Sequence, residues 1–593
     1  MQITPFGGPA VKVTPLLDNE PDVQGENGSR WRWSTVLEER EEQVFLLLTL
    51  LIGVLVGLTV VAFIVLTERL GMRLYPAGGA VWRRLLVPVA GSLAMGYLLY
   101  RYFPDARGSG VPQTKAALFA REGRITLSTV LGKFFCTSAT LASGIPLGRE
   151  GPSVQVGAGI ASVLGRRLGL RPEKVKALLP VGASAAIAAA FNTPMAAVLF
   201  SLEEVMGDLH APVLGSVVLA SATSWAMLRM VLGNHPLFVV PQYELVHPLE
   251  FGIYAVLGIA GGFLSAAFTK LLLGMRRHFL RLPRKTRWWH PVAGGLMVGV
   301  MGCFVPQVLG VGYSYVGDAL NGGMAFRLMA LLVVLKLFAV TTSYASGNAG
   351  GIFGPSLFLG AMLGGTVGSV AHHFLPGQTA NPGAYALVGM GVLFAGIVRA
   401  PMTSVLMIFE MTRDYSVIVP LMIANLVSLF ISSRLQKQPI YEALAHQDGI
   451  HLPNLKTRVE LDQRKVSQVM RSAAEVLPAQ MSVRDAAERA RVSQFRAWPV
   501  ADEDGIVGVL SRRDLERFQS DSAADNKLMD LLPSLDFPHV HADQVLHLAL
   551  ERMSAAHLDL LPVVNRADVH KLEGIVTLQD VLESYGVDTP GSP

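Results

Sequence analysis

The sequence contains few residues of two classes that soluble proteins of its length usually carry in number. Only 2 of its 593 residues are cysteine, so no disulfide framework supports the fold. Charged residues make up only 16% of the chain, against about 25% in an average soluble domain. Hydrophobic residues make up 51%. This shortage of charge predicts a protein that lies largely in a lipid bilayer.

The net charge of +5 does not indicate a nucleic-acid partner. Basic pairs such as Arg166-Arg167 and Arg276-Arg277 fall between apolar segments, as expected of loops in a membrane protein. Residues 1–42 are polar, rich in Pro and Gly, and end in a run of charges. We expect this segment to be a cytosolic tail without a cleavable signal peptide.

Apolar segments follow one another from residue 43 to residue 434. The first, 43–70, is long enough to cross a bilayer, and 174–201 reads as another uninterrupted segment. Several others, such as 153–165 and 384–397, are too short to cross about 30 Å of hydrocarbon. Short helices bounded by Gly or Pro are typical of transporters and some channels, in which broken helices meet around a cavity. We therefore expect an all-α, polytopic membrane protein.

Three Gly-rich breaks interrupt the apolar segments: Gly108-Ser109-Gly110-Val111-Pro112, Gly148-Arg149-Glu150-Gly151-Pro152 and Gly350-Gly351-Ile352-Phe353-Gly354-Pro355. Two lie in the first half of the membrane region and one in the second, which indicates inverted repeats of broken, tilted helices. A Glu150 carboxylate at membrane depth costs at least a few kcal/mol unless it faces a cavity or a partner. The flanking glycines let the backbone approach an ion, and a helix that starts there attracts anions. The second break therefore predicts an ion site with a titratable gate.

Hydrophobicity falls after Arg434, and the remaining residues contain an internal repeat. Residues 508–514 resemble residues 574–580, 66 positions later, and each copy follows a Pro-containing triplet, 498–500 or 561–563. We expect each copy to form a strand led by the proline, a turn, a second strand and a helix capped by Ser or Thr.

These breaks occur together with Phe191-Asn192-Thr193-Pro194, Val398-Arg399-Ala400-Pro401 and Pro439-Ile440-Tyr441-Glu442. In order and spacing the set resembles the CLC family of chloride channels and chloride/proton exchangers, followed by a pair of cytosolic α/β CBS domains. The resemblance implies an N-terminal tail at 1–42, a transmembrane domain at 43–445, a linker at 446–465, and CBS domains at 466–520 and 526–588.

The resemblance also implies roles for single residues. Glu150 would be the external gate, which occupies an anion site when ionised and swings away when protonated, because two nearby negative charges repel. Glu204, the second of two adjacent glutamates, matches the internal proton-transfer residue of exchangers. The implied chloride ligands are Ser109, the backbone N–H groups of Ile352 and Phe353, and Tyr441.

The family further implies a homodimer with one pore per subunit, and neither enzymatic activity nor a required metal or cofactor. A bacterial inner membrane is the expected location, with the N-terminus and the CBS domains in the cytosol. Chloride/proton exchange is favoured by Glu204, and a passive voltage- or proton-gated chloride channel is the alternative. A membrane-tethered nucleotide sensor without transport is a third hypothesis, against which the intact set of Ser109, Glu150 and Tyr441 argues.

Some positions depart from the family pattern or allow two interpretations. Gln113 replaces the usual glutamate of the first break, and Lys115 adds a positive charge that could alter the transport rate or the local pairing. Lys133 could attract anions or pair with a charge across the fold. Glu410 is interpreted as a fold-stabilising pair or cap.

CBS pairs form a cleft that can bind ATP, ADP or AMP. Two hydroxyl-x-x-carboxylate patterns match this use: Ser511 with Asp514, and Thr577 with Asp580. The carboxylates could accept hydrogen bonds from ribose hydroxyls, while the hydroxyls and a helix N-terminus could meet phosphate. The alternative is a purely structural role that stabilises the dimer.

Overall fold

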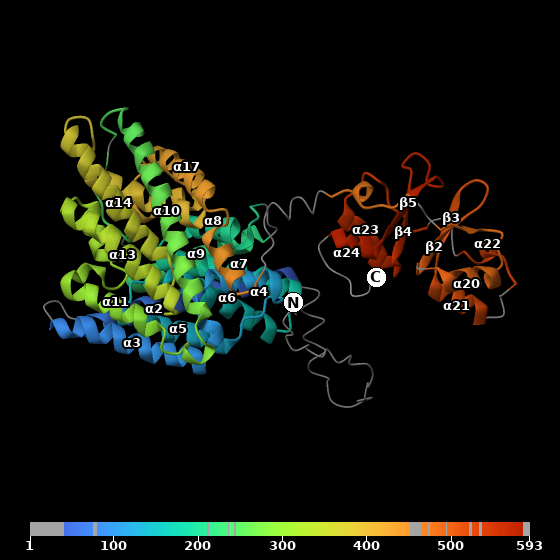
Figure 1. Ribbon diagram of the computed structural model, residues 1–593, viewed down its shortest axis with the longest axis horizontal. Helices are drawn as coiled ribbons and strands as arrows, with labels where there is room; N and C mark the ends of the chain where they lie inside the picture. The colour runs from blue at the N-terminus through green and yellow to red at the C-terminus, as the bar shows by residue number, and fades with distance from the viewer. Residues whose placement is uncertain are drawn as a thin grey trace, which may run out of the picture. The chain divides into compact units, whose positions relative to one another are not determined.

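The computed structural model describes residues 41–74, 80–209, 213–234, 236–241, 243, 245–450, 464–472, 475–493, 495–520, 525–532 and 537–584. Its contacts divide the chain into two compact units, 1–452 and 453–593. Nearly all of the expected N-terminal tail and most of the expected linker lie outside the described residues. The expected fold class is confirmed, since a helical unit is followed by one that combines strands with helices (Figure 1).

Helices tilted at different angles form the first unit (Figure 1). In chain order they are α2 (Glu41–Leu74), α3 (Val81–Arg101), η1 (Pro104–Ala106), α4 (Val111–Ala120), α5 (Leu127–Ala142), α6 (Glu150–Arg167), α7 (Pro172–Phe191), α8 (Pro194–Phe200), η2 (Ser201–Met206), α9 (Leu214–Leu232), α10 (Glu250–Arg281), η3 (Arg284–Thr286), α11 (Pro291–Phe304), η4 (Pro306–Val308), α12 (Tyr313–Leu320), α13 (Phe326–Ser346), α14 (Phe353–Phe374), α15 (Pro382–Val398), α16 (Pro401–Thr412), α17 (Ile418–Leu435) and α18 (Ile440–Gln447).

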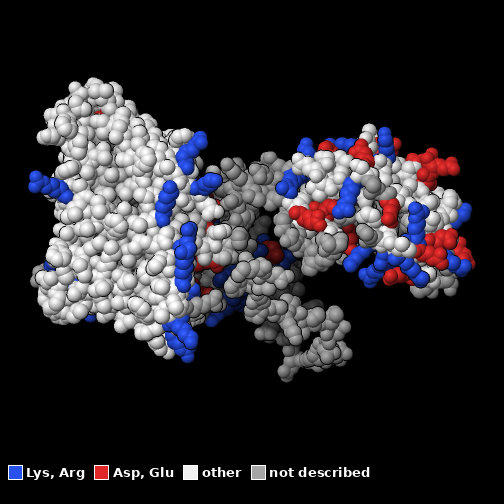
Figure 2. Space-filling model, in the orientation of Figure 1, with Lys and Arg blue, Asp and Glu red and all other residues white. Residues whose placement is uncertain are grey.

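The first unit has the dimensions and surface of a multi-pass membrane protein. Within the described ranges, seven helices are long and apolar enough to cross a bilayer, whereas the apolar helices α5, α11 and α15 are shorter. Figure 2 shows that a wide band of its surface carries no charged side chain, while the C-terminal unit carries charges of both signs. The unit therefore combines full spans with the short helices that the sequence predicted.

One apolar segment that the sequence predicted as continuous consists of two helices. The apolar run 174–201 is not continuous, because α7 ends at Phe191 and α8 begins at Pro194. Asn192 adopts a left-handed conformation with φ of 60°, which closes the end of α7. Pro194 then supplies the first residue of a new helix, where its missing N–H does no harm.

The two halves of the membrane unit are tied together by reciprocal caps. The Glu410 carboxylate on α16 accepts the N–H groups of Met195 and Ala196, at the start of α8, at 3.0 and 2.7 Å. In return, Glu203 on η2 accepts the N–H of Thr403, at the start of α16, at 2.8 Å. Each of these two elements caps the other, as expected of the inverted repeats that the matching breaks indicated. Glu410 is therefore a helix cap, one of the two roles expected for it.

A buried lysine marks the equivalent place in each half. Lys133 on α5 donates to the carbonyls of Ala106 and Gly108 at 3.0 and 2.5 Å. Lys336 on α13 donates in the same way to two carbonyls ahead of α12, at 3.0 and 2.7 Å. Both side chains are fully buried. Lys133 thus binds backbone oxygens at the start of the first break and just before it. Neither expectation for this lysine, an anion or an opposite charge, matches these contacts.

The C-terminal unit contains two similar halves. Its elements are η5 (Val466–Gln468), β1 (Leu477–Pro478), α20 (Val483–Val492), β2 (Ala497–Ala501), β3 (Ile506–Ser511), α21 (Arg512–Ser520), α22 (Leu528–Leu531), α23 (Leu546–Ala556), β4 (Leu560–Val564), β5 (Leu572–Thr577) and α24 (Leu578–Ser584). β2 pairs with β3 and β4 with β5, both antiparallel, and β1 adds a parallel strand to β2.

The sequence repeat is also a repeat of structure. Pro499 pairs with Val509 in the first half, and Pro562 pairs with Ile575 in the second. Both ladders shift register between the first and the second residue after the proline. The expected order of strand, turn, strand and helix is present in each half. The expectation of proline-led strands was wrong in detail, because each proline is the third residue of its strand.

Candidate functional site

Two of the Gly-rich breaks pair with each other in the membrane unit. Gly148 and Gly351 exchange two backbone hydrogen bonds, each with an N···O distance of 2.7 Å. Two residues further on, α6 begins at Glu150 and α14 begins at Phe353. The first N–H groups of a helix lack partners within the helix and carry partial positive charge. The pairing of the two breaks therefore gathers two helix N-termini that attract anions.

The remaining break places α4 against the same point. Gly110 has φ of 108°, and a Cβ added to it would lie 2.1 Å from the carbonyl oxygen of Gly151. Only glycine fits such an approach in this conformation. A Cβ added to Gly151 would lie 2.9 Å from Ser109 Oγ. The Ser109 hydroxyl therefore lies beside the start of α6.

Two buried hydroxyls at this point have no hydrogen-bond partner among the described residues: Ser109 Oγ and Tyr441 Oη. Both residues are 0% exposed. The Tyr441 phenol lies near the Ser109 hydroxyl and near Tyr344 and Glu204, and the Tyr344 hydroxyl accepts the N–H of Ser109 at 3.2 Å. An unsatisfied buried hydroxyl costs about 1–3 kcal/mol. A bound ligand that accepts both hydroxyls would remove that cost, and a small anion has this property.

Ile352 and Phe353 are fully buried at the start of α14. The Phe353 ring lies 4.8 Å from the ring of Phe191, 5.5 Å from that of Phe200 and 4.4 Å from that of Phe394, between ring centroids. These aromatic rings form an apolar wall beside the helix start. Hydrogen bonds from the backbone to an anion are stronger where water is excluded.

The Glu150 carboxylate reaches across to α14. Its Oε2 accepts the N–H of Gly354 at 3.2 Å, and its Oε1 accepts the hydroxyl of Tyr313. Glu150 is fully buried. The carboxylate thus occupies a helix N-terminus as a bound anion would. Sequence reasoning did not identify Tyr313, which begins the short helix α12, and no local pattern in the sequence distinguishes this tyrosine.

Arg149 does not pair with its neighbour Glu150. Its Nη1 lies 3.4 Å from Oε1 of Glu68 on α2, and its guanidinium carbon lies 5.5 Å from the centroid of the Tyr313 ring. The side chain is 6% exposed. Arg149 therefore supports the tyrosine that contacts the carboxylate, and its charge is shared with Glu68.

The adjacent residues Glu203 and Glu204 have different partners. Glu203 faces the start of α16, where its Oε2 also accepts the Thr403 hydroxyl at 2.6 Å. Glu204 forms an ion pair with Lys115 on α4, with an Nζ to Oε1 distance of 2.9 Å. The Lys115 and Glu204 side chains are only 11% and 8% exposed. Glu203 is therefore a structural cap, whereas Glu204 is tied to the helix that follows the Ser109 break.

A basic cavity lies next to the first break. It has a volume of 320 Å³ and includes Gly108, immediately before Ser109. A smaller cavity of 80 Å³ shares part of this lining and reaches Tyr344. Asp448, on the wall of the larger cavity, pairs with an arginine of α10. The arginines that line the larger cavity are Arg107, Arg121, Arg124, Arg276 and Arg287. Such an excess of positive charge raises the local concentration of anions.

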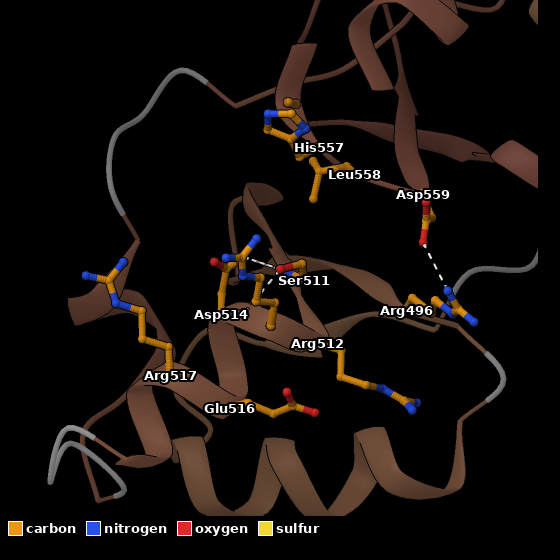
Figure 3. Close-up of a pocket in the computed structure, with 11 residues that line it drawn as sticks. Arg496, Ser511, Arg512, Asp514, Glu516, Arg517, His557, Leu558 and Asp559 are labelled. Carbon is orange, nitrogen blue, oxygen red and sulfur yellow. Dashed lines mark hydrogen bonds and ion pairs between the residues drawn. The ribbon is translucent and has the colours of Figure 1, made fainter. Parts of the chain in front are cut away.

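The C-terminal unit has a separate cavity of 1010 Å³ between its two halves. Ser511 and Asp514 come from the first half, whereas His557 and Asp559 come from the second (Figure 3). The Ser511 hydroxyl donates to Asp514 Oδ2 at 2.5 Å, and this oxygen also accepts the Ser511 N–H at 3.0 Å. The arginines in the lining are Arg496, Arg512, Arg513 and Arg517. The carboxylates of Asp514, Glu516 and Asp559 also line it. The cavity is therefore large enough for a phosphate-bearing ligand and has a small excess of positive charge.

The second hydroxyl-x-x-carboxylate pattern has a different environment. Asp580 Oδ2 accepts the Thr577 hydroxyl at 2.6 Å, and Asp580 Oδ1 accepts Nε of Arg471 at 2.9 Å. Asp580 is 7% exposed. Both carboxylate oxygens are thus engaged by the chain itself, while the hydrogen bonds of Asp514 within its own pattern use one oxygen. Of the two candidate nucleotide patterns, the structure places the Ser511 pattern on a cavity and closes the other with Arg471.

Comparison with known proteins places these features in a family. The family model described as voltage-gated chloride channel matches residues 91–433, and the model described as CBS domain matches residues 466–521 and 529–586. The H(+)/Cl(-) exchange transporter ClcA of Vibrio cholerae is 31% identical over 416 residues, which cover 68% of this chain and 89% of that protein. A putative chloride channel protein, ClcB-like, of Ralstonia nicotianae is 35% identical over 381 residues, 63% of this chain and 88% of that protein.

Solved structures agree with this assignment. A slow cyanobacterial Cl-/H+ antiporter superposes with a TM-score of 0.63 at 27% identity and covers 68% of this chain and 97% of its own. A eukaryotic CLC transporter, at 19% identity, shares the fold over 90% of this chain and 97% of its own, with a TM-score of 0.59. The chain is a multi-pass membrane protein that belongs to the voltage-gated chloride channel (CLC) family and carries two CBS domains after its membrane unit.

Proposed function

We propose that the protein transports chloride across a membrane in exchange for protons. The observation that carries this proposal is the pair of buried hydroxyls without partners, Ser109 Oγ and Tyr441 Oη, beside two helix N-termini and the Glu150 carboxylate. Donors without acceptors fit an anion, and an adjacent titratable carboxylate can compete with that anion. Relatives named H(+)/Cl(-) exchange transporters support the same reaction.

The proposed chloride ligands are the hydroxyls of Ser109 and Tyr441 and the backbone N–H groups of Ile352 and Phe353. All of these donors are dipoles and none is a full positive charge, so the ion is held weakly enough to leave again. The phenylalanine rings around Phe353 keep water away from the site. The arginine-lined cavity beside Gly108 would supply anions from one side.

Glu150 acts as the gate in this proposal. When ionised, the carboxylate takes the place of an anion at the start of α14, where Gly354 N–H and the Tyr313 hydroxyl hold it. When protonated, the side chain is neutral and is attracted less strongly to the positive end of the helix, so it moves aside and chloride enters. One carboxylate would thus couple the movement of a proton to that of chloride.

Glu204 is the proposed internal proton station, and its partner supports a second candidate function. An ion pair with Lys115 at 2.9 Å favours the ionised carboxylate. A residue that must gain and lose protons during each cycle would be hindered by this pairing. The Lys115–Glu204 pair therefore favours a passive chloride channel, gated by voltage or by protons, as the alternative.

Ion fluxes in liposomes separate the two functions. Purified protein in a chloride gradient should drive protons against their own gradient, and Glu150→Gln should abolish the proton flux while chloride still moves. A reversal potential that follows the chloride Nernst potential at every pH gradient would establish the channel and refute exchange. Proton flux that survives in Glu150→Gln would refute the role of Glu150.

We further propose that the Ser511–Asp514 cavity binds an adenine nucleotide, ATP, ADP or AMP, which regulates transport. Support comes from its volume of 1010 Å³ and its arginine lining. Asp514 would accept hydrogen bonds from the ribose, and the cavity arginines would meet phosphate. Transport itself needs no cofactor in this proposal, and a purely structural role of the CBS pair is the alternative.

We also propose a homodimer in a bacterial inner membrane, with the N-terminus and the CBS domains in the cytosol. In the 18-residue apolar windows of segments 214–232 and 418–447, only 28% and 33% of the residues are buried within the subunit, so their apolar faces are available to lipid or to a second copy. The bacterial sources of the exchange transporters that resemble the chain support this location.

A further inference from the structure

Tyr313 is the one residue of α12 that contacts the Glu150 carboxylate in the described structure. It begins α12, a helix of the second half of the membrane unit, whereas Glu150 begins α6 in the first half. The two side chains meet above Gly354, since a Cβ added there would lie 2.9 Å from Tyr313 Oη and 3.0 Å from Glu150 Oε2. Glycine at 354 is therefore what allows the phenol and the carboxylate to come together.

Two hydrogen-bond donors face the Glu150 carboxylate. Each of its oxygens faces a donor: the Gly354 N–H at Oε2 and the Tyr313 hydroxyl at Oε1. An ionised carboxylate accepts at both oxygens, whereas a protonated acid would have to donate its O–H to the Tyr313 oxygen and so lose the bond that the phenol donates. Hydrogen bonds to a charged acceptor are also about twice as strong as neutral ones. The tyrosine therefore stabilises the ionised side chain in the position that excludes an anion.

The surroundings hold the tyrosine in place. The Arg149 guanidinium lies over its ring at 5.5 Å, and the Phe238 ring meets it edge-on at 6.0 Å. Among the other charged and titratable groups nearby, the Tyr441 phenol interacts with Glu150, and Arg149 interacts with Tyr313 and pairs with the Glu68 carboxylate. Removal of the Tyr313 hydroxyl would leave all of these groups in place.

We propose that Tyr313 is a latch on the Glu150 gate: its hydroxyl bond must break before chloride can enter, so it sets the pH at which the gate opens. Tyr313 is a positioning residue, because it acts through Glu150 and not on chloride. The inference rests on the proposed gate function of Glu150. It adds a determinant of the pH dependence that belongs to the other half of the molecule.

The test compares Tyr313→Phe with Tyr315→Phe, a matched control on the same helix, in liposomes at a series of symmetric pH values. Tyr313→Phe should move the midpoint of chloride flux up by about one pH unit, equivalent to a tenfold change in the ratio of protonated to ionised Glu150. The chloride-to-proton ratio should stay at its wild-type value, since the proton carrier is unchanged. Tyr315→Phe should leave the pH profile where it is.

Two further variants show whether the effect passes through the carboxylate. In a Glu150→Gln background, Tyr313→Phe should change nothing, because no charge remains to be stabilised. Tyr313→His keeps an aromatic ring with an N–H donor and should give a smaller shift, which also serves if Tyr313→Phe does not yield folded protein. A pH profile of Tyr313→Phe that matches Tyr315→Phe, or an equal effect in the Glu150→Gln background, would overturn the latch.

The experiments give different results depending on whether the proposed exchange or the Tyr313 latch is wrong. If wild-type protein moves chloride without protons, exchange is wrong, yet the shift of the chloride-flux midpoint in Tyr313→Phe remains measurable. If exchange is coupled and the midpoint does not move, the latch is wrong and exchange stands.

Discussion

The buried ion pair between Lys115 and Glu204 leads to a quantitative prediction about stability and coupling. Its atoms lie 2.9 Å apart, and about nine-tenths of each side chain is hidden from solvent. The perturbations are Lys115→Met, Glu204→Leu and the two together. The single variants each leave one ionisable group buried without its partner, whereas the double variant replaces the pair by apolar side chains of similar volume.

The magnitude follows from the cost of a buried charge. Removal of one partner of a buried ion pair costs about 3–5 kcal/mol, while replacement of both by apolar residues is often neutral. Glu204→Leu should therefore destabilise the fold by about that amount, and the double variant should recover most of the loss. Lys115→Met should cost less as the pH falls, because a protonated Glu204 needs no positive partner.

Melting temperatures in detergent measure this cycle. The control is the exposed pair of Glu122 and Arg124, whose side chains are 62% and 69% exposed at 3.5 Å, and Glu122→Gln should change stability by no more than about 1 kcal/mol. Equal stability of Glu204→Leu and the wild type, or additive losses in the double variant, would refute the buried-pair argument.

The same variants bear on coupling. If Lys115 keeps Glu204 ionised, Lys115→Met should raise the proton flux per chloride at neutral pH, because Glu204 then takes up a proton more readily. An unchanged or lower proton flux in Lys115→Met, with the protein folded, would show that the lysine does not restrain Glu204.

Two other predictions concern sites away from the anion path. Glu410→Gln removes the charge that caps α8 through Met195 and Ala196, so it should lower stability by about 1–2 kcal/mol and leave the chloride-to-proton ratio unchanged; a changed ratio would contradict a purely structural role. Titration of the full chain with ATP by calorimetry should give one site per chain, and Asp514→Ala should weaken binding at least tenfold while Asp580→Ala has little effect. Two equal sites, or no loss in Asp514→Ala, would contradict the assignment to the Ser511 cavity.

Sequence reasoning found the breaks because their chemistry is local. Gly110 needs a left-handed conformation and has no room for a Cβ, so the requirement for glycine can be read from the motif itself. The isolated carboxylate of Glu150 in an apolar stretch is equally visible. The repeat around Ser511 and Thr577 also predicted the strand and helix order of the C-terminal unit.

Contacts between distant segments could not be predicted in the same way. Tyr313 lies 163 positions from Glu150 along the chain, and nothing next to it in the sequence marks it as a partner. Arg471 and Asp580 likewise meet across 109 positions, which is why the two nucleotide patterns looked equivalent. The end of α7 at Phe191 was not predicted, because apolar residues continue through 194–200. A hydrophobicity pattern therefore gives no sign of the left-handed residue Asn192 between the two helices.

The approximate symmetry of the membrane unit separates its scaffold from its site. Lys133 and Lys336 bind carbonyls in equivalent places, and the caps of Glu203 and Glu410 are reciprocal. Contacts present in both halves serve both halves alike, so they do not distinguish one half from the other. The two halves differ at the starts of equivalent helices: α6 begins with Glu150, whereas α14 begins with Phe353.

Only one of these two adjacent helix starts carries a titratable side chain, so only that start can respond directly to protons. Tyr313 and Lys115 enlarge that difference, since each engages a glutamate through a contact that has no counterpart among the described hydrogen bonds of the other half. The pH dependence of transport should therefore depend on these asymmetric residues, while substitutions at the symmetric lysines and caps should act on stability.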